Sequence, residues 1–132
     1  MLVALGATAP VASLEVDVAR LRSARGQLRL CLTSQPDKFP SCIGDARAVR
    51  RSVAADGAPI RFDGLPFGAY AVAVIHDENG NRKLDTMLGI PREGFGFSRN
   101  PAIGFGAPRF SAASFALDAG GAQQRITMRY LL

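Results

Sequence analysis

The stretch GLPFGAYAVAVIHD, residues 64–77, decides the fold class of this chain. Its first residues, Gly64 to Gly68, combine glycine and proline in the pattern of a tight turn. From Tyr70 to Ile75 the side chains are apolar at both odd and even positions, so an extended strand here is apolar on both faces. Such a strand is typical of the middle of a sheet that is covered on both sides.

Shorter alternating runs on either side of this stretch predict further strands. Ser13–Leu21 and Gln27–Thr33 alternate around the turn-like Arg22–Gly26, so we expect these two strands to form a hairpin. Ala46–Ala55 fits either an edge strand or a helical turn. More strands are expected at Ile60–Asp63, Ser114–Leu117 and Gln124–Leu131. No long run has the helical period, and the sequence therefore predicts an all-β sandwich, immunoglobulin-like or transthyretin-like, of about seven strands.

The composition fits one globular domain, which we place at residues 13–132. Hydrophobic residues make up 48% of the chain, which is too many for a disordered protein. The formal net charge of +5 comes almost entirely from arginines that are spread along the chain. A nucleic-acid-binding protein concentrates such residues on one element, so we predict solvated strand faces and no nucleic-acid partner. Weak attraction to anionic surfaces stays open as an alternative.

The N-terminus and the two cysteines both indicate export. Residues 1–12 are apolar and rich in alanine, and they resemble the remnant of a secretory signal peptide, with a disordered tail as the alternative. This run is too short to span a bilayer, and no transmembrane segment is predicted. Cys31 and Cys42 flank a proline-containing loop, and we expect them to form a disulfide that stabilises the domain by about 3 kcal/mol. The predicted location is periplasmic or extracellular.

Two sequence motifs resemble known families. FDGLPFGAYAVAV, residues 62–74, is similar to the turn and strand of transthyretin-like and carboxypeptidase-regulatory-like sandwich domains. HDENGNRKLDTMLGIPREGFGFS, residues 76–98, together with FGAPRF at 105–110, resembles an uncharacterised bacterial family of small exported proteins, a numbered domain of unknown function. The resemblance extends from about Leu14 to Tyr130. It implies a sandwich fold and export, and it implies no reaction, substrate or catalytic residue.

The loop after the central strand is the best candidate for a metal site. The side-chain oxygens of Asp77, Asn79, Asn81 and Asp85, with the carbonyl of Lys83, have the spacing of a calcium-binding loop. An arginine occupies the usual glycine position, however, and a leucine occupies the position of the bidentate glutamate. The alternative is a hairpin loop whose Asp and Asn side chains bond their own backbone. The sequence thus predicts either no cofactor or a weak Ca²⁺ site.

His76, at the end of the central strand, is the only histidine of the chain. It could act as a base, a ligand or a pH-sensitive hydrogen-bonding group. Ser98 and Ser111 are the candidate nucleophiles, but neither stands in a nucleophile-elbow motif. Structural hydrogen bonding is therefore favoured, and we expect the chain not to be an enzyme.

Gly89–Phe110 is a long segment without strand periodicity. One interpretation is a groove for a small apolar ligand or a peptide, lined by aromatic rings at His76, Phe95, Phe97, Phe105 and Phe110. The other is that the phenylalanines cover an open end of the sandwich. Exposure of so much apolar surface is unfavourable, so the cover is favoured.

The function that the sequence predicts is a non-catalytic binding or accessory module of the periplasm or envelope. Its expected partner is another envelope protein or a small apolar ligand. The first alternative is a structural interaction domain that pairs with another protein through an edge strand. The second, less favoured, is a hydrolase built around His76.

Overall fold

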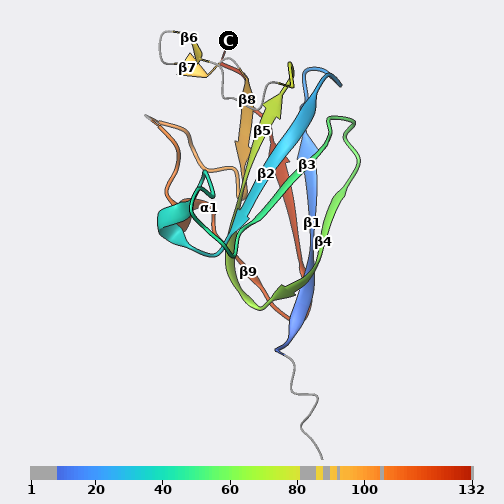
Figure 1. The fold of residues 1–132 in the computed structure, drawn as a ribbon, viewed down its shortest axis with the longest axis vertical. Coiled ribbons are helices and arrows are strands. Elements are labelled where there is room, and N and C mark those ends of the chain that lie inside the picture. Colours follow the sequence, from blue (N-terminus) through green and yellow to red (C-terminus); the bar gives the residue numbers. More distant parts are fainter. Residues whose placement is uncertain (1–8, 81–85, 88–89, 92, 105, 132) are drawn as a thin grey trace, which may run out of the picture.

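The computed structural model describes residues 9–80, 86–87, 90–91, 93–104 and 106–131, and their regular structure is nearly all β-strand. Two sheets face each other across one core (Figure 1). The first sheet has three strands, in the order β10 (Ala122–Thr127), β1 (Val11–Ala19) and β4 (Ile60–Pro66). The second has five: β3 (Val49–Ala54), β2 (Gln27–Thr33), β5 (Gly68–Asp77) and β8 (Gly94–Phe97) in that order, with β9 (Phe115–Leu117) paired to β5. The predicted all-β sandwich is confirmed, and the choice between an immunoglobulin-like and a transthyretin-like arrangement stays a prediction.

Four short elements lie outside these two sheets. β6 (Thr86–Met87) and β7 (Ile90–Pro91) pair as a small hairpin between β5 and β8. The 3-10 helix η2 (Pro36–Lys38) follows β2, and the four-residue helix α1 (Phe110–Ala113) precedes β9. In the part of the chain that the structure describes, no helix has the length and apolar character that a membrane span needs.

β5 lies inside its sheet, as the two apolar faces of its sequence predict. It pairs with β2 along one side and with β8 and β9 along the other. Residues 71–74 are all buried, whereas Tyr70 and Ile75 at the two ends are half-buried. Val72 and Val74 face the main core, and Ala71 and Ala73 face a second cluster on the outer side of the sheet.

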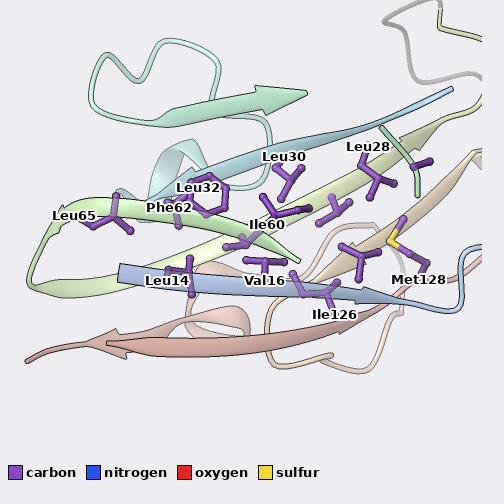
Figure 2. Packing of buried hydrophobic residues seen from close by; sticks show 14 of the residues in the cluster. Leu14, Val16, Leu28, Leu30, Leu32, Ile60, Phe62, Leu65, Ile126 and Met128 are labelled. Carbon is purple, nitrogen blue, oxygen red and sulfur yellow. The ribbon is translucent and has the colours of Figure 1, made fainter. Parts of the chain in front are cut away.

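The main core fills the space between the two sheets (Figure 2). β1 directs Leu14 and Val16 into it, and β2 directs Leu28, Leu30 and Leu32 into it from the opposite sheet. These are the alternate positions that the sequence pattern assigns to the inner face. Burying each such side chain stabilises the fold by about 1.5–3 kcal/mol relative to leaving it exposed.

The predicted hairpin between the first two strands is wrong. β1 pairs with β4 and, in parallel, with β10, whereas β2 pairs with β3 and β5 in the other sheet. The intervening loop, residues 20–26, crosses from one sheet to the other, and it has left-handed backbone at Arg20 and Gly26. A Cβ atom at Gly26 would overlap the backbone carbonyl of Asp77, so only glycine lets the loop pass so close to β5. The interpretation of residues 46–55 is resolved as an edge strand, β3.

The interpretation of residues 89–110 as a segment without strands is also wrong, because it contains β8. Glycine alternates with phenylalanine in this strand, so the inner face carries no apolar side chains that would reveal a period of two. The missing side chains have a physical reason. A Cβ at Gly94 would overlap the ring of Tyr130, and one at Gly96 would lie 2.7 Å from Cγ2 of Ile126. The glycines therefore allow the C-terminal segment to pack directly on β8.

Candidate functional site

The predicted disulfide is present, and it ties a covering loop to the outer face of the larger sheet. Cys31 lies on β2 and Cys42 in the loop that follows, with their Cα atoms 5.8 Å apart. Both residues are buried in the second cluster. The ring of Phe39, from the same loop, packs edge-on against Phe97 and Phe110, with ring centroids 5.9 Å and 6.2 Å apart.

A buried carboxylate anchors the far end of this loop. Asp45 accepts a hydrogen bond from the Thr33 hydroxyl and another, of 2.7 Å, from Gln35 Nε2. The backbone N–H of Arg47 donates to the same carboxylate at 3.0 Å. The hydrogen bond from Thr33 is the main cause that lowers the pKa of Asp45. Asp45 therefore has a structural role, which could not be predicted from an aspartate in a loop alone.

The described phenylalanines of the predicted groove pack in the second cluster, on the outer face of the larger sheet, and the choice between a groove and a cover stays a prediction. Phe95 and Phe97 are each 9% exposed, and their ring centroids are 6.0 Å apart. The depression beside them has a volume of about 10 Å³, which is the space of about one water molecule. Phe110 packs against the same cluster, and Phe105 lies outside the described residues.

His76 lies on the opposite face of the sheet from these rings, so the structure does not bring the predicted groove residues together. It is fully buried, pairs in register with Gly94, and hydrogen-bonds on both ring nitrogens. Nε2 lies 2.8 Å from the carbonyl of Arg25, and Nδ1 lies 2.7 Å from the hydroxyl of Tyr130. A carbonyl only accepts, so Nε2 donates to Arg25, and in a neutral ring Nδ1 then accepts from Tyr130. His76 thus holds the loop 20–26 and the C-terminal segment together.

Glu78 also binds the loop 20–26, and the sequence did not predict this role. Its carboxylate accepts from Arg22 Nη2 at 2.6 Å, from Ser23 Oγ at 2.7 Å and from Arg25 Nη2 at 3.3 Å. The hydrogen bond from Arg22 is the main cause that lowers the pKa of Glu78 to about 2. The Arg22 guanidinium also stacks over the ring of Tyr130, 4.5 Å from its centroid. These groups form one polar network at this end of the sandwich.

The predicted calcium loop is described only in part. Asp77 is buried at the end of β5, with Arg29 Nη1 3.9 Å from its carboxylate, and Asn79 is exposed. The other three predicted ligands, Asn81, Lys83 and Asp85, lie outside the described residues. Among the residues that are described, no three His, Cys, Asp or Glu side chains gather in a way that could hold a metal ion. The calcium site stays a prediction.

The two candidate nucleophiles are far from such a role in the described geometry. Ser98 is fully buried, and its hydroxyl accepts from the N–H of Val72 at 2.9 Å and donates to the carbonyl of Ala113 at 2.5 Å. It thereby continues the pairing along β5 between β8 and β9. Ser111 is exposed on α1. Neither hydroxyl bonds to His76, whose two nitrogens are occupied as described above.

One long side of the sandwich is closed. Phe95 of β8 exchanges two backbone hydrogen bonds with Arg129, of 3.0 and 2.8 Å, which joins the two sheets there. The Asn100 side chain then covers the free edge of β10: Oδ1 accepts from the N–H of Thr127 at 2.8 Å, and Nδ2 donates to the carbonyl of Arg125 at 2.9 Å. An amide used in this way replaces a further strand.

The other long side, where β3 and β4 are the outer strands, is open (Figure 1). At β4, the outward carbonyl of Arg61 accepts from Arg51 Nη1 at 2.5 Å. The Arg51 guanidinium also lies over the ring of Phe62, 4.1 Å from its centroid. In the same strand Asp63 carries a charge, and Pro66 has no backbone N–H to donate. The β4 edge is therefore protected against pairing.

The alternation of the backbone shows which groups of β2 point toward β3. Val72 bonds to Ser98 through both its N–H and its carbonyl, so these two backbone groups point away from β2. The N–H and carbonyl of the next residue, Ala73, therefore point toward β2, where Ala73 pairs with Cys31. Along β2 the direction alternates again, so the N–H and carbonyl of Leu30 point toward β3.

The same alternation identifies the free groups of the β3 edge. Arg51, the partner of Leu30, bonds to β2. Arg50, Ser52 and Ala54 consequently direct their N–H and carbonyl groups outward, and all three residues are exposed. No described side chain or backbone group outside the sheet bonds to them. This edge is the best candidate for a functional site in the described part of the chain.

Comparison with protein families shows which family the chain resembles. A model of the family described as "Uncharacterized protein conserved in bacteria (DUF2141)" matches residues 16–126, which extend from β1 to β10. No curated protein and no solved structure matches the chain. The function has to be inferred from the geometry of the chain itself.

Proposed function

The chain belongs to the DUF2141 family of uncharacterised bacterial proteins, and we propose that it is an exported, non-catalytic module that binds another envelope protein through the edge of β3. The observation that supports this most directly is the asymmetry of the sandwich. One long side is closed by backbone bonds and by Asn100, and the other leaves the outward groups of β3 available. An extended segment that adds a strand to an open edge obtains affinity from main-chain hydrogen bonds.

The state of the chemically active side chains supports a non-catalytic role. A general base or nucleophile has to reach its substrate, whereas His76 and Ser98 are fully buried and bonded to other groups of the chain. The depression beside Phe95 is too small for a substrate. The bonds of His76 and Ser98 stabilise the fold, and this supports the proposed non-catalytic role.

The disulfide supports export. Cys31–Cys42 joins β2 to the covering loop, and disulfides of this structural kind persist in oxidising compartments. The apolar residues 1–12 agree with a signal peptide remnant. Cell fractionation with thiol labelling of the native chain tests the location: we expect an envelope or extracellular fraction with no reactive thiols.

Site-specific photo-crosslinking in the bacterium that produces the chain tests the binding edge. A photoreactive residue replaces Ser52 on β3, and in a matched control it replaces Gln123, which is exposed on the outer face of the other sheet. We expect one discrete product from position 52 and none from position 123. The partner, once purified, should slow hydrogen exchange at the amides of residues 50, 52 and 54. A discrete product from position 123 alone, or from neither position, would contradict the proposal.

A further inference from the structure

We propose that the segment that pairs with β3 is an extended strand of the partner that alternates acidic and apolar residues; this inference rests on the proposed use of the β3 edge. Three arginines lie at the edge: Arg47 before β3, and Arg50 and Arg51 within it. Arg47 and Arg50 are exposed, and neither forms an ion pair with a described residue. The edge therefore presents positive charge that the described part of the chain leaves available to a partner.

The acidic residues nearest in sequence form no ion pair with these arginines. Asp45 is 8% exposed, and its carboxylate is directed at the covering loop, where it accepts from Thr33 and Gln35. Asp56 lies in the turn after β3 and accepts from the N–H of Ala58 at 3.0 Å. Both carboxylates bond to neutral groups of their own loops and form no ion pair with an arginine of the edge, so these guanidinium groups stay available to an acidic partner.

The two faces of an added strand would meet different surroundings. Arg50 lies on the outer face of the sheet, in register with Cys31, so an acidic residue opposite it would form a cross-strand pair. Val49 and Val53 lie on the inner face, half-buried against the main core. Apolar residues of the added strand would extend that core. Alternation of acidic and apolar residues meets both requirements at once.

Arg51 makes the edge selective. It points inward from β3, where it stacks on Phe62 and bonds to the carbonyl of Arg61. An inward-pointing charge on an edge strand disfavours pairing with strands that are apolar on both faces. A second copy of this chain is disfavoured as well, because it would bring its own Arg47 and Arg50 to the same edge. An acidic strand is the occupant that the charges favour.

Synthetic peptides test the charge of the occupant. The probe is a blocked peptide of about ten residues that alternates glutamate and valine, and the matched peptide has glutamine in place of each glutamate. We expect the acidic peptide to shift amide resonances of residues 49–54 and to bind at least about fivefold more tightly than the glutamine peptide at low salt. Rising salt should reduce this difference, since the pair is exposed.

Three variants locate the interaction. Arg50→Glu should weaken binding of the acidic peptide by about tenfold, whereas Arg125→Glu, the same change on the outer face of the other sheet, should alter it by less than about twofold. Ser52→Pro should keep the fold, because the N–H that it removes faces outward, and it should abolish binding of both peptides.

The outcomes separate this inference from the proposed function. Equal affinity for the two peptides, with binding of both lost in Ser52→Pro, overturns the preference for an acidic strand. The proposed binding at the β3 edge would still hold. Concentration-dependent dimerisation with shifts at residues 49–54 overturns it in favour of a second copy. Failure of both peptides together with failure of crosslinking at position 52 overturns the proposed function as well.

Discussion

Replacing Cys31 and Cys42 together with alanine should lower the free energy of unfolding by about 3 kcal/mol. The bond joins residues that are 11 positions apart in sequence. In the chain-entropy model, a crosslink around about a dozen residues removes about 9.5 cal/mol/K from the unfolded chain, or about 2.8 kcal/mol at 25 °C. Both sulfurs are buried, so lost packing adds to this loss.

The loss can be read as a shift of the melting temperature. An unfolding entropy of about 2.1 cal/mol/K per residue amounts to about 0.28 kcal/mol/K for a chain of 132 residues. The double variant should therefore melt about 10 °C below the oxidised wild type, as measured by circular dichroism. Its urea m-value should rise, because an unfolded chain without the crosslink exposes more surface.

Reductant supplies the matched control for this experiment. It should lower the melting temperature of the wild type close to that of the double variant, and it should leave the variant unchanged. The variant should still fold, because Asp45 anchors the covering loop through Thr33 and Gln35. The reasoning fails if the variant melts within about 3 °C of the oxidised wild type, or if the unreduced wild type contains two free thiols.

Three further predictions concern the network at the end of the sandwich. Gly94→Ala should destabilise by about 1–3 kcal/mol in urea titrations, because a Cβ there overlaps the Tyr130 ring; an unchanged midpoint would show that the ring can move away. Tyr130→Phe should cost about 1–3 kcal/mol, because it leaves Nδ1 of buried His76 without its donor. Tyr70→Phe is the matched control, since that hydroxyl bonds only to an exposed carbonyl, and equal losses would contradict the role of His76. The pKa of Glu78 is lowered to about 2 in the folded chain from its usual 4.5, so its contribution is complete above pH 4.5 and is lost as the pH falls toward 2. Glu78→Gln should therefore flatten the dependence of stability on pH in that window, and parallel curves for variant and wild type would refute the assignment.

The sequence predicted those parts of the fold that depend on local pattern. A strand that is apolar on both faces needs cover on both sides, and β5 has it, from the main core on one face and from the disulfide-tied loop on the other. The disulfide between Cys31 and Cys42 was predictable for a similar reason. The chain has two cysteines, and they flank a short proline-containing loop, so each has the other as its candidate partner.

Strand partners were not predictable in the same way. Alternation tells which face of Val11–Ala19 is buried, but it does not tell which strand lies beside it. The loop 20–26 has turn-like residues, yet its left-handed positions at Arg20 and Gly26 carry the chain across to the other sheet. A strand that pairs in parallel with β10, more than a hundred residues away in sequence, leaves no mark on its own residues.

The missed strand β8 shows a second limit. Its inner positions are Gly94 and Gly96, and the groups that fill their places, Tyr130 and Ile126, come from another segment. A periodicity analysis counts side chains on one strand, so it fails where a neighbouring strand supplies them. The sequence left several roles open for His76, and the structure shows it hydrogen-bonded through both ring nitrogens.

The open edge of β3 could not be predicted from local sequence, because it depends on how the two sheets are assembled. Residues 46–55 indicated an edge strand or a helical turn, and nothing local showed that the opposite side of the sandwich would be closed by Asn100. The edge of β10 is covered by a side chain of the chain itself, so the contrast with the uncovered edge of β3 supports a binding role for β3. β3 receives no such cover in the described residues, and it carries Arg50 on the outer face of the sheet and Arg51 on the inner face. An edge with two arginines resists indiscriminate pairing while it remains able to pair, which is what selective recognition of an acidic strand requires.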